Sequence, residues 1–198
     1  MRRRTFDAVA TMAGLVLAVV LAIGGGLLLW GHSVVTTDVH NQLAAQKIVF
    51  PTASSPEIKA LPASDATAMK AYAGQMMTTG AQAQTYADHF IAVHLTEIGG
   101  GKTYSQLSAQ AMAQPKNTTL AEPVATVFKG TTLRGMLLNA YGFWKFGEIA
   151  AIGAIVSFIG AAVLLLLALA GIWHLRRVPE AAEVFPRITH PAKVEQSA

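Results

Sequence analysis

Residues 8–30 read AVATMAGLVLAVVLAIGGGLLLW, and residues 149–173 read IAAIGAIVSFIGAAVLLLLALAGIW. Neither stretch contains an Asp, Glu, Lys, Arg or His, and each exceeds the ~20 helical residues that cross a hydrocarbon core of ~30 Å. Charged residues make up only 13% of the chain, which agrees with lipid-embedded segments. The two stretches therefore predict transmembrane helix 1 at residues 8–30 and transmembrane helix 2 at residues 149–173.

These two spans divide the rest of the chain into three parts. Residues 31–148 are predicted to form one compact helical domain, because no run of alternating β-branched residues reaches strand length. Residues 1–7 form a basic N-terminus, and residues 174–198 form a polar, proline-containing tail that we expect to be disordered. The predicted fold is thus an all-α membrane protein with two transmembrane helices that flank a compact helical extracytoplasmic domain.

The distribution of charge predicts the topology. The formal net charge is +4, but residues 31–148 hold eight Lys or Arg and seven Asp or Glu, so the basic excess lies at the chain ends. Arg2, Arg3 and Arg4 precede the first span, which by the positive-inside rule predicts a two-pass protein of the cell membrane with both termini cytoplasmic. The first apolar run is longer than the h-region of a signal peptide, so we expect an uncleaved anchor rather than an export signal.

Helix signals recur between the spans. Ser55-Pro56-Glu57 orders a cap, a first-turn proline and an acid, while Thr103 with Gln106 and Thr119 with Glu122 each fit a capping box. Breakers such as Gly130 separate these segments. The predicted helices cover residues 33–50, 65–77, 82–98, 104–112, 120–128 and 132–148, the first and last being continuous with the membrane spans.

Both spans carry small residues at intervals of four, the pattern of close helix packing in membranes. The predicted packing residues are Ala10, Gly14, Ala18, Ala22 and Gly26 in the first span and Gly153, Ser157 and Ala161 in the second. They predict packing of the two helices on each other or on a partner, although Ala and Gly are common throughout the chain. Trp30, Trp144 and Trp173 are predicted to anchor the protein at the membrane interfaces.

One cluster has the composition of a metal site. His89, His94 and Glu97 could supply the two histidines and one carboxylate of a non-haem iron centre. On a regular helix His94 and Glu97 lie about 60° apart, but His89 lies about 140° from His94, so the three do not share one face. His94 also falls in an apolar stripe, where a hydrogen-bonded core histidine is the commoner interpretation.

Other chemistry is not indicated. The GGGKT sequence at residues 99–103 lacks the first glycine of a phosphate-binding loop, and the chain has no cysteine, so we expect no nucleotide site, no thiol nucleophile and no cofactor. The basic pI reflects topology rather than nucleic-acid binding. The strongly apolar residues 133–146 are interpreted as a surface that packs against the short helices, or that docks a membrane protein or lipid.

Several segments resemble a family of small actinobacterial membrane proteins that are largely uncharacterised. The resemblance rests on residues 2–7 (RRRTFD), 86–95 (YADHFIAVHL), 100–104 (GGKTY) and 132–144 (TLRGMLLNAYGFW). It implies residence in an actinobacterial cell membrane. Some members carry the label "aromatic ring-opening dioxygenase", but such enzymes are soluble and build an iron site on a mixed fold, from which this chain departs.

We therefore expect a membrane-anchored interaction or accessory protein, without identified catalytic residues, that contacts the lipid bilayer and a membrane-protein partner or a second copy of itself. Two alternatives stay open on the sequence. One is a membrane-anchored metalloenzyme that uses His89, His94 and Glu97. The other is a sensor domain for a lipid or another small ligand.

Overall fold

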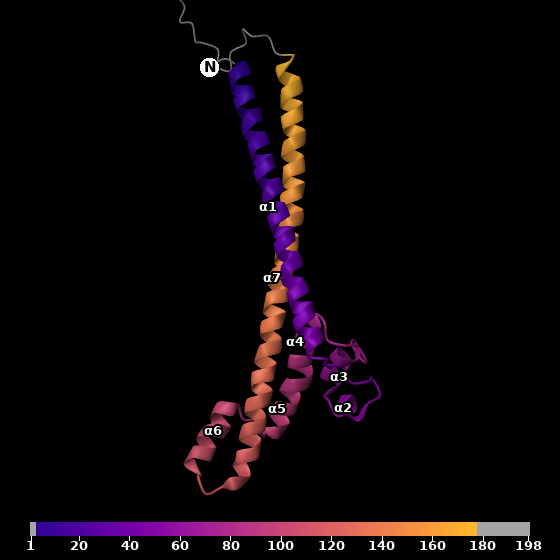
Figure 1. The fold of residues 1–198 in the computed structure, drawn as a ribbon, viewed down its shortest axis with the longest axis vertical. Coiled ribbons are helices and arrows are strands. Elements are labelled where there is room, and N and C mark those ends of the chain that lie inside the picture. Colours follow the sequence, from indigo (N-terminus) through magenta and orange to yellow (C-terminus); the bar gives the residue numbers. More distant parts are fainter. Residues whose placement is uncertain (1–2, 178–198) are drawn as a thin grey trace, which may run out of the picture. The chain divides into compact units, whose positions relative to one another are not determined.

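Two long helices account for about half of the chain. The computed structural model describes residues 3–177, and over that range the chain forms helices and no β-strand. Helices α1 (Arg3–Ala45) and α7 (Ala121–Leu175) are both long and apolar enough to cross a membrane (Figure 1). The predicted all-α class and the two long apolar helices are confirmed.

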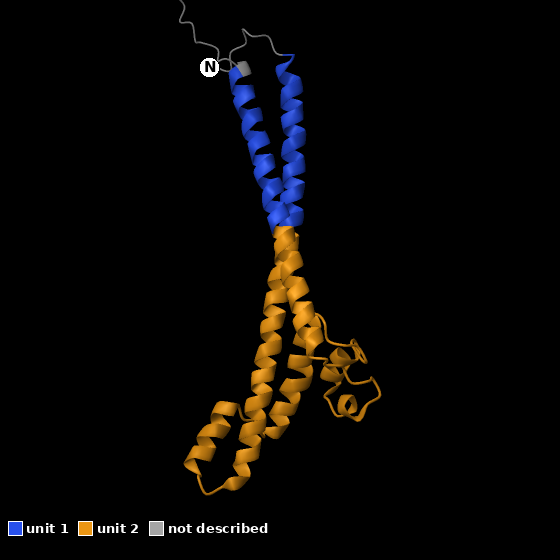
Figure 2. Cartoon of the chain, viewed as in Figure 1, with its two compact units in different colours: residues 1–27, 153–198 blue, residues 28–152 orange. Residues whose placement is uncertain are grey.

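Short helices connect α1 to α7. These are α2 (Pro56–Lys59), α3 (Ala63–Lys70), α4 (Gly80–Tyr86), a π-helical turn η1 (Ala87–Ile91), α5 (Ala92–Ile98), α6 (Tyr104–Ala113) and a 3-10 turn η2 (Thr118–Leu120). The described chain divides into two compact units (Figure 2). One, which we call the paired-helix unit, comprises Met1–Leu27 and Gly153–Ala198, and the other, the central unit, comprises Leu28–Ile152.

Some of the helix signals act as predicted. Ser55 accepts a hydrogen bond from the backbone of Ile58 at the start of α2, and Thr103 forms a capping box with Gln106 at the start of α6. The predicted box at Thr119 is wrong, because Asn117 caps the 3-10 turn there. A second capping box, between Thr79 and the Gln82 side chain, begins α4 and was not predicted.

The helix boundaries differ from the prediction in several places; α1, for example, ends at Ala45 and not at residue 50. Helix α3 ends at Lys70 instead of Met77, since the following residues turn to let Met77 pair with Ile48. Gly130 does not break the helix, so residues 121–128 and 132–148 belong to one helix, α7. A Cβ at Gly130 would overlap the Leu95 side chain, so the glycine is where α7 accepts a neighbouring side chain. The predicted disorder of the tail falls mainly on residues 178–198, outside the described residues.

In the paired-helix unit, α1 and α7 contact each other through small residues spaced by seven. Within this unit the buried positions of α1 are Thr11, Ala18 and Gly25, and those of α7 are Ala154, Ala161 and Ala168. A spacing of seven is the repeat of paired helices that interlock side chains along a common seam. The sequence left open whether the spans pack on each other, and within this unit they do.

Glycines form the holes of this seam. A Cβ at Gly25 would lie 3.1 Å from the ring of Phe158, and a Cβ at Gly160 would lie 3.1 Å from Leu21 Cδ1. Each glycine therefore accepts a large side chain from the opposite helix. Close approach of this kind is how helices associate where lipid removes any hydrophobic driving force between them.

The predicted four-residue ladder is only partly the contact surface. Ala18 and Ala161 are buried, and Gly14, Gly153 and Ser157 are partly buried. Ala10, Ala22 and Gly26 are exposed, and a Cβ at Gly26 would meet nothing within 4 Å. A spacing of four drifts around a helix of 3.6 residues per turn, so a ladder of five such positions leaves the seam.

The central unit has a core built around Phe50. Its fully buried side chains include Phe50, Ile58, Met69 and Met77, which come from the segment between α1 and α4. The Phe50 ring lies 5.4 Å from Tyr72 and 5.3 Å from Tyr86. Buried residues of the long helices close this core, namely Val39, Leu43 and Leu137.

Trp144 belongs to this core rather than to an exposed belt. A Cβ at Gly80 would overlap Trp144 Cβ, so the first residue of α4 packs directly on the tryptophan. Trp30 and Trp173 are exposed, at 68% and 58%. The prediction for Trp144 missed this packing because the residues that cover the tryptophan lie far from it in the sequence.

Candidate functional site

A π-helical turn lies where the sequence suggested a metal site. Residues Ala87–Ile91 form one π turn between α4 and α5, in an otherwise continuous helical run. Single π turns inside helices occur frequently at functional sites. The extra residue also shifts the helical phase, so the angles predicted for His89 relative to His94 and Glu97 do not apply.

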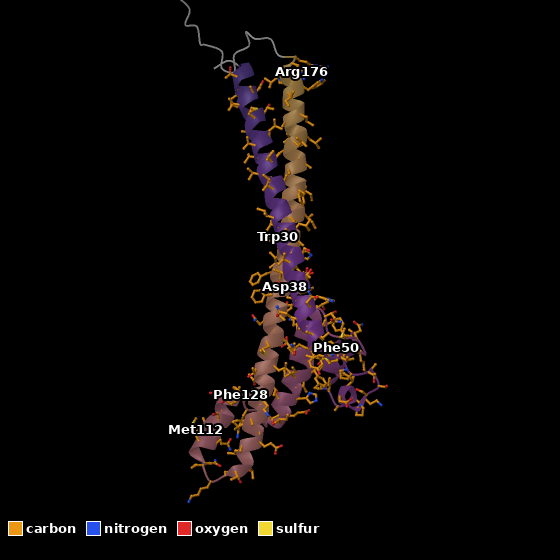
Figure 3. All side chains as sticks on the ribbon, in the orientation of Figure 1. Trp30, Asp38, Phe50, Met112, Phe128 and Arg176 are labelled. Carbon is orange, nitrogen blue, oxygen red and sulfur yellow. The ribbon has the colours of Figure 1, made fainter. Side chains whose placement is uncertain are left out.

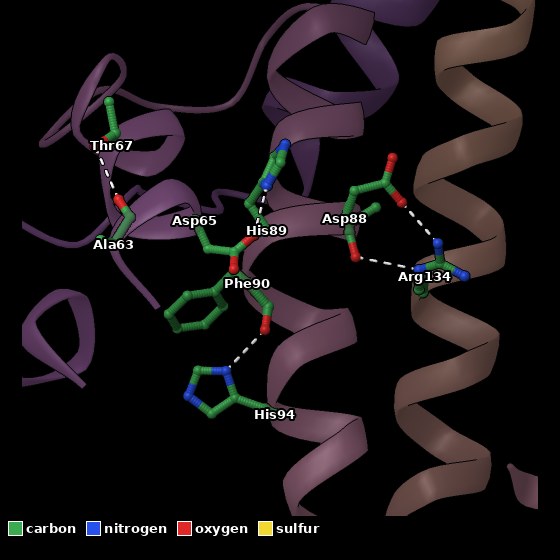
Figure 4. Close-up of polar contacts among 9 residues, drawn as sticks. Ala63, Asp65, Thr67, Asp88, His89, Phe90, His94 and Arg134 are labelled. Atoms are coloured by element: carbon green, nitrogen blue, oxygen red, sulfur yellow. Dashed lines mark hydrogen bonds and ion pairs between the residues drawn. The ribbon is translucent and has the colours of Figure 1, made fainter. Parts of the chain in front are cut away.

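Two carboxylates fasten this turn to its neighbours on opposite sides (Figure 4). The His89 Nδ1–H donates to Asp65 Oδ1 of α3 over 2.7 Å. The Arg134 guanidinium of α7 donates to Asp88 Oδ1 over 2.6 Å and to the Ala87 carbonyl over 3.2 Å. The geometry describes a polar clamp that holds the π turn between α3 and α7.

His94 continues an aromatic row along α4, the π turn and α5. Its ring lies 4.5 Å from Phe90, which in turn lies 4.8 Å from Tyr86. The His94 Nδ1–H donates to the Phe90 carbonyl over 2.7 Å (Figure 4). Burial of Tyr86 raises the pKa of its phenol. The predicted hydrogen-bonded histidine is thus confirmed.

The predicted metal ligands are not brought together. Within residues 3–177, no group of three or more His, Asp or Glu side chains is arranged to hold a metal ion. His89 pairs with Asp65, His94 pairs with a backbone carbonyl, and Glu97 lies on the exposed surface of α5. The hydrogen bonds of these two histidines therefore join the π turn to α3 and His94 to the preceding turn of its own helix.

A second feature of the central unit is a groove between α1 and α7, with a volume of about 430 Å³. Its floor and walls combine apolar and uncharged polar side chains with one carboxylate, and we call this surface the α1–α7 groove. The lining residues are Val35, Asp38, Val39, Gln42, Met136, Asn139, Ala140 and Phe143.

Two large apolar side chains that line this groove are exposed. Met136 is 67% exposed and Phe143 is 54% exposed, seven positions apart on α7. Leu137 and Trp144, one position further along in each case, face the core instead. The predicted apolar surface at residues 133–146 therefore has two sides, one that packs against the short helices and one that is open.

Among the described residues, the carboxylate in the groove has no charged partner. Asp38 is exposed, and within residues 3–177 it makes no hydrogen bond or ion pair with another side chain. Gln42 and Asn139 add uncharged donors and acceptors beside it. Asp38 was not among the predicted site residues, because its proximity to Met136 and Phe143 depends on how α1 and α7 pair.

Comparison with known proteins adds no relative. No family model matches the chain, and neither a curated protein nor a solved structure matches it significantly.

Proposed function

We propose that this chain is a membrane-anchored interaction protein whose α1–α7 groove binds a helix of another membrane protein. The groove, with exposed Met136 and Phe143 beside Asp38, is the observation that carries the proposal. Apolar side chains flanked by a few polar groups are typical of surfaces that receive an amphipathic helix.

Membrane residence is supported by the distribution of residue sizes on the two long helices, which expose large apolar side chains and bury small ones. Small residues occupy the seam of the paired-helix unit, whereas large apolar residues point away from it, as the side chains along both helices in Figure 3 illustrate. Val16, Val20, Val163 and Leu166 are among the exposed ones. In water this surface would be a strong driving force for aggregation, whereas lipid covers it at no cost.

The groove has a suitable position for such a partner. Asp38 follows Trp30 by eight residues of continuous helix, which corresponds to ~12 Å beyond an interfacial tryptophan. We place residues 31–148 on the extracytoplasmic side with both termini in the cytoplasm, because of the arginines that precede the first span. This agrees with the cell-membrane location that the resemblance to small actinobacterial membrane proteins implies.

Site-specific crosslinking tests the proposal. A photoreactive residue at Asn139 lies in the groove, and one at Lys145 provides the control, because Lys145 lies on the same exposed helix about 120° away. We expect one membrane protein to crosslink from position 139 in native membranes, and the additional change Phe143→Ala to abolish that product. Equal crosslinking from both positions, or none from either, would contradict the assignment.

A further inference from the structure

A separate groove lies in the paired-helix unit, outside the surface assigned above. Its volume is about 460 Å³, and its walls are mostly small or aliphatic residues of α1 and α7. Among the lining residues are Ala10, Gly14, Leu164 and Leu167. An open and mostly apolar channel between two helices can hold an acyl chain.

Two ionisable groups stand at one end of this groove. Asp7 Oδ2 lies 3.9 Å from His174 Nε2, which is too far for a hydrogen bond. Within the described residues Asp7 Oδ2 is buried and has no hydrogen-bond partner. The nearby Thr11 hydroxyl does not serve it, because that hydroxyl donates to the Asp7 carbonyl over 2.7 Å. The carboxylate and the imidazole are thus close together but do not form a hydrogen bond with each other.

The depth of this pair in the chain is informative. Asp7 directly precedes the uncharged residues 8–30, and His174 directly follows the uncharged residues 149–173. In a protein that spans the bilayer, both groups therefore lie at the boundary between hydrocarbon and headgroups. A ligand here has an acyl chain on one side of the boundary and a polar group on the other.

We propose that the groove binds a phospholipid with a phosphoethanolamine headgroup. The ammonium donates hydrogen bonds to the Asp7 carboxylate, the phosphate accepts one from the His174 imidazole, and an acyl chain lies along Gly14 and Leu164. A headgroup with a cation and an anion matches a site with one carboxylate and one imidazole. A choline headgroup matches less well, because its quaternary ammonium has no N–H to donate.

The proposal rests on the membrane residence proposed above, and reconstitution separates the two. Full-length protein is placed in nanodiscs that contain equal amounts of phosphatidylethanolamine, phosphatidylcholine and phosphatidylglycerol. The protein is then released from the nanodiscs, and the lipid that stays bound to it is measured by native mass spectrometry. Protein that does not enter nanodiscs would refute membrane residence. Protein that enters them without lipid preference would refute only the lipid site.

Two independent changes address the polar end and the apolar channel. Asp7→Asn removes the anion, with Glu97→Gln as a control at an exposed acid of the central unit, outside both grooves. Ala10→Phe fills the channel without entering the buried seam, with Ala22→Phe as a control at another exposed alanine of α1.

We expect the wild type and both controls to retain phosphatidylethanolamine in preference to phosphatidylcholine by about threefold to tenfold, as one charge-assisted hydrogen bond at a partly exposed site provides. Asp7→Asn and Ala10→Phe should each abolish the preference. A preference that survives both changes overturns the proposal, as does a stronger preference for phosphatidylglycerol.

Free phosphoethanolamine forms the last arm of the experiment. If millimolar phosphoethanolamine displaces the retained lipid completely, the site recognises the headgroup alone and the acyl channel plays no part, which contradicts the proposal. Retention of the lipid under that competition supports a site for the whole lipid.

Discussion

Replacement of Gly80 by alanine should destabilise the central unit by about 1–3 kcal/mol, the usual cost of overpacking. The added Cβ would lie 2.6 Å from Trp144 Cγ and 2.9 Å from its Cδ2, and closer still to its Cβ. Carbon atoms in contact normally lie about 3.5–4.0 Å apart. A new rotamer cannot relieve the clash at Trp144 Cβ, because that atom is fixed to the backbone of α7. The start of α4 must therefore move away from α7 by an ångström or more, on the order of the shortfall in contact distance.

Two other glycines serve as matched controls. A Cβ at Gly142 meets nothing within 4 Å, so Gly142→Ala should stabilise α7 by about 0.5–1 kcal/mol through helix propensity. A Cβ at Gly130 would contact the end of the Leu95 side chain, which can rotate away, so Gly130→Ala should have an effect between the other two.

The assay is thermal unfolding of the detergent-solubilised protein, with protease sensitivity of the central unit as the measure of unfolding. Each 1 kcal/mol corresponds to a shift of roughly 3–6 °C for a unit of this size. The order of stability should be Gly142→Ala, then the wild type, then Gly130→Ala, and last Gly80→Ala. If Gly80→Ala unfolds at or above the wild-type temperature, the close packing of α4 on Trp144 is incorrect.

Three further predictions concern other contacts. Arg134→Ala should cost about 1 kcal/mol or less in the same unfolding assay, because its ion pair with Asp88 is partly exposed to water, and the double change with Asp88→Ala should show coupling between the two sites. Gly25→Leu should separate the paired helices, whereas Gly24→Leu should not. The measurement is disulfide crosslinking between cysteines introduced into the two spans, since the chain has no cysteine of its own. Equal effects of the two changes would place the seam elsewhere. Because burial raises the pKa of Tyr86, the folded state keeps its proton where the unfolded state loses it, so stability should fall as pH rises above about 10, and Tyr86→Phe should remove that part of the loss.

The local helix signals could be recognised from the sequence alone. A side chain that caps a helix acts within four residues, so Ser55 and Thr103 were identifiable from their neighbours in sequence. The prediction for Gly130 was wrong because the effect of this glycine depends on a residue distant in the sequence. The cost of a glycine inside a helix is about 1 kcal/mol, which tertiary packing readily outweighs, and Leu95 packs at that glycine from α5.

The candidate site depended more strongly on tertiary structure. His89, His94 and Glu97 are close in sequence, but the π turn changes their helical phase, and Asp65 and a backbone carbonyl engage the two histidines. Asp38 and Phe143 are far apart in sequence and line one groove only because α1 and α7 pair in the central unit.

By itself the sequence determined that this chain has two helices of membrane-spanning length, since that property depends only on the number of consecutive uncharged residues. It did not determine which face of each helix makes contact, because small residues occur on several faces of both. The tertiary structure decided that point. Phe158 and Leu21 each pack against a glycine of the opposite helix, Gly25 and Gly160 respectively. The buried positions, of which Gly25 is one, follow a seam of spacing seven in place of the ladder of spacing four.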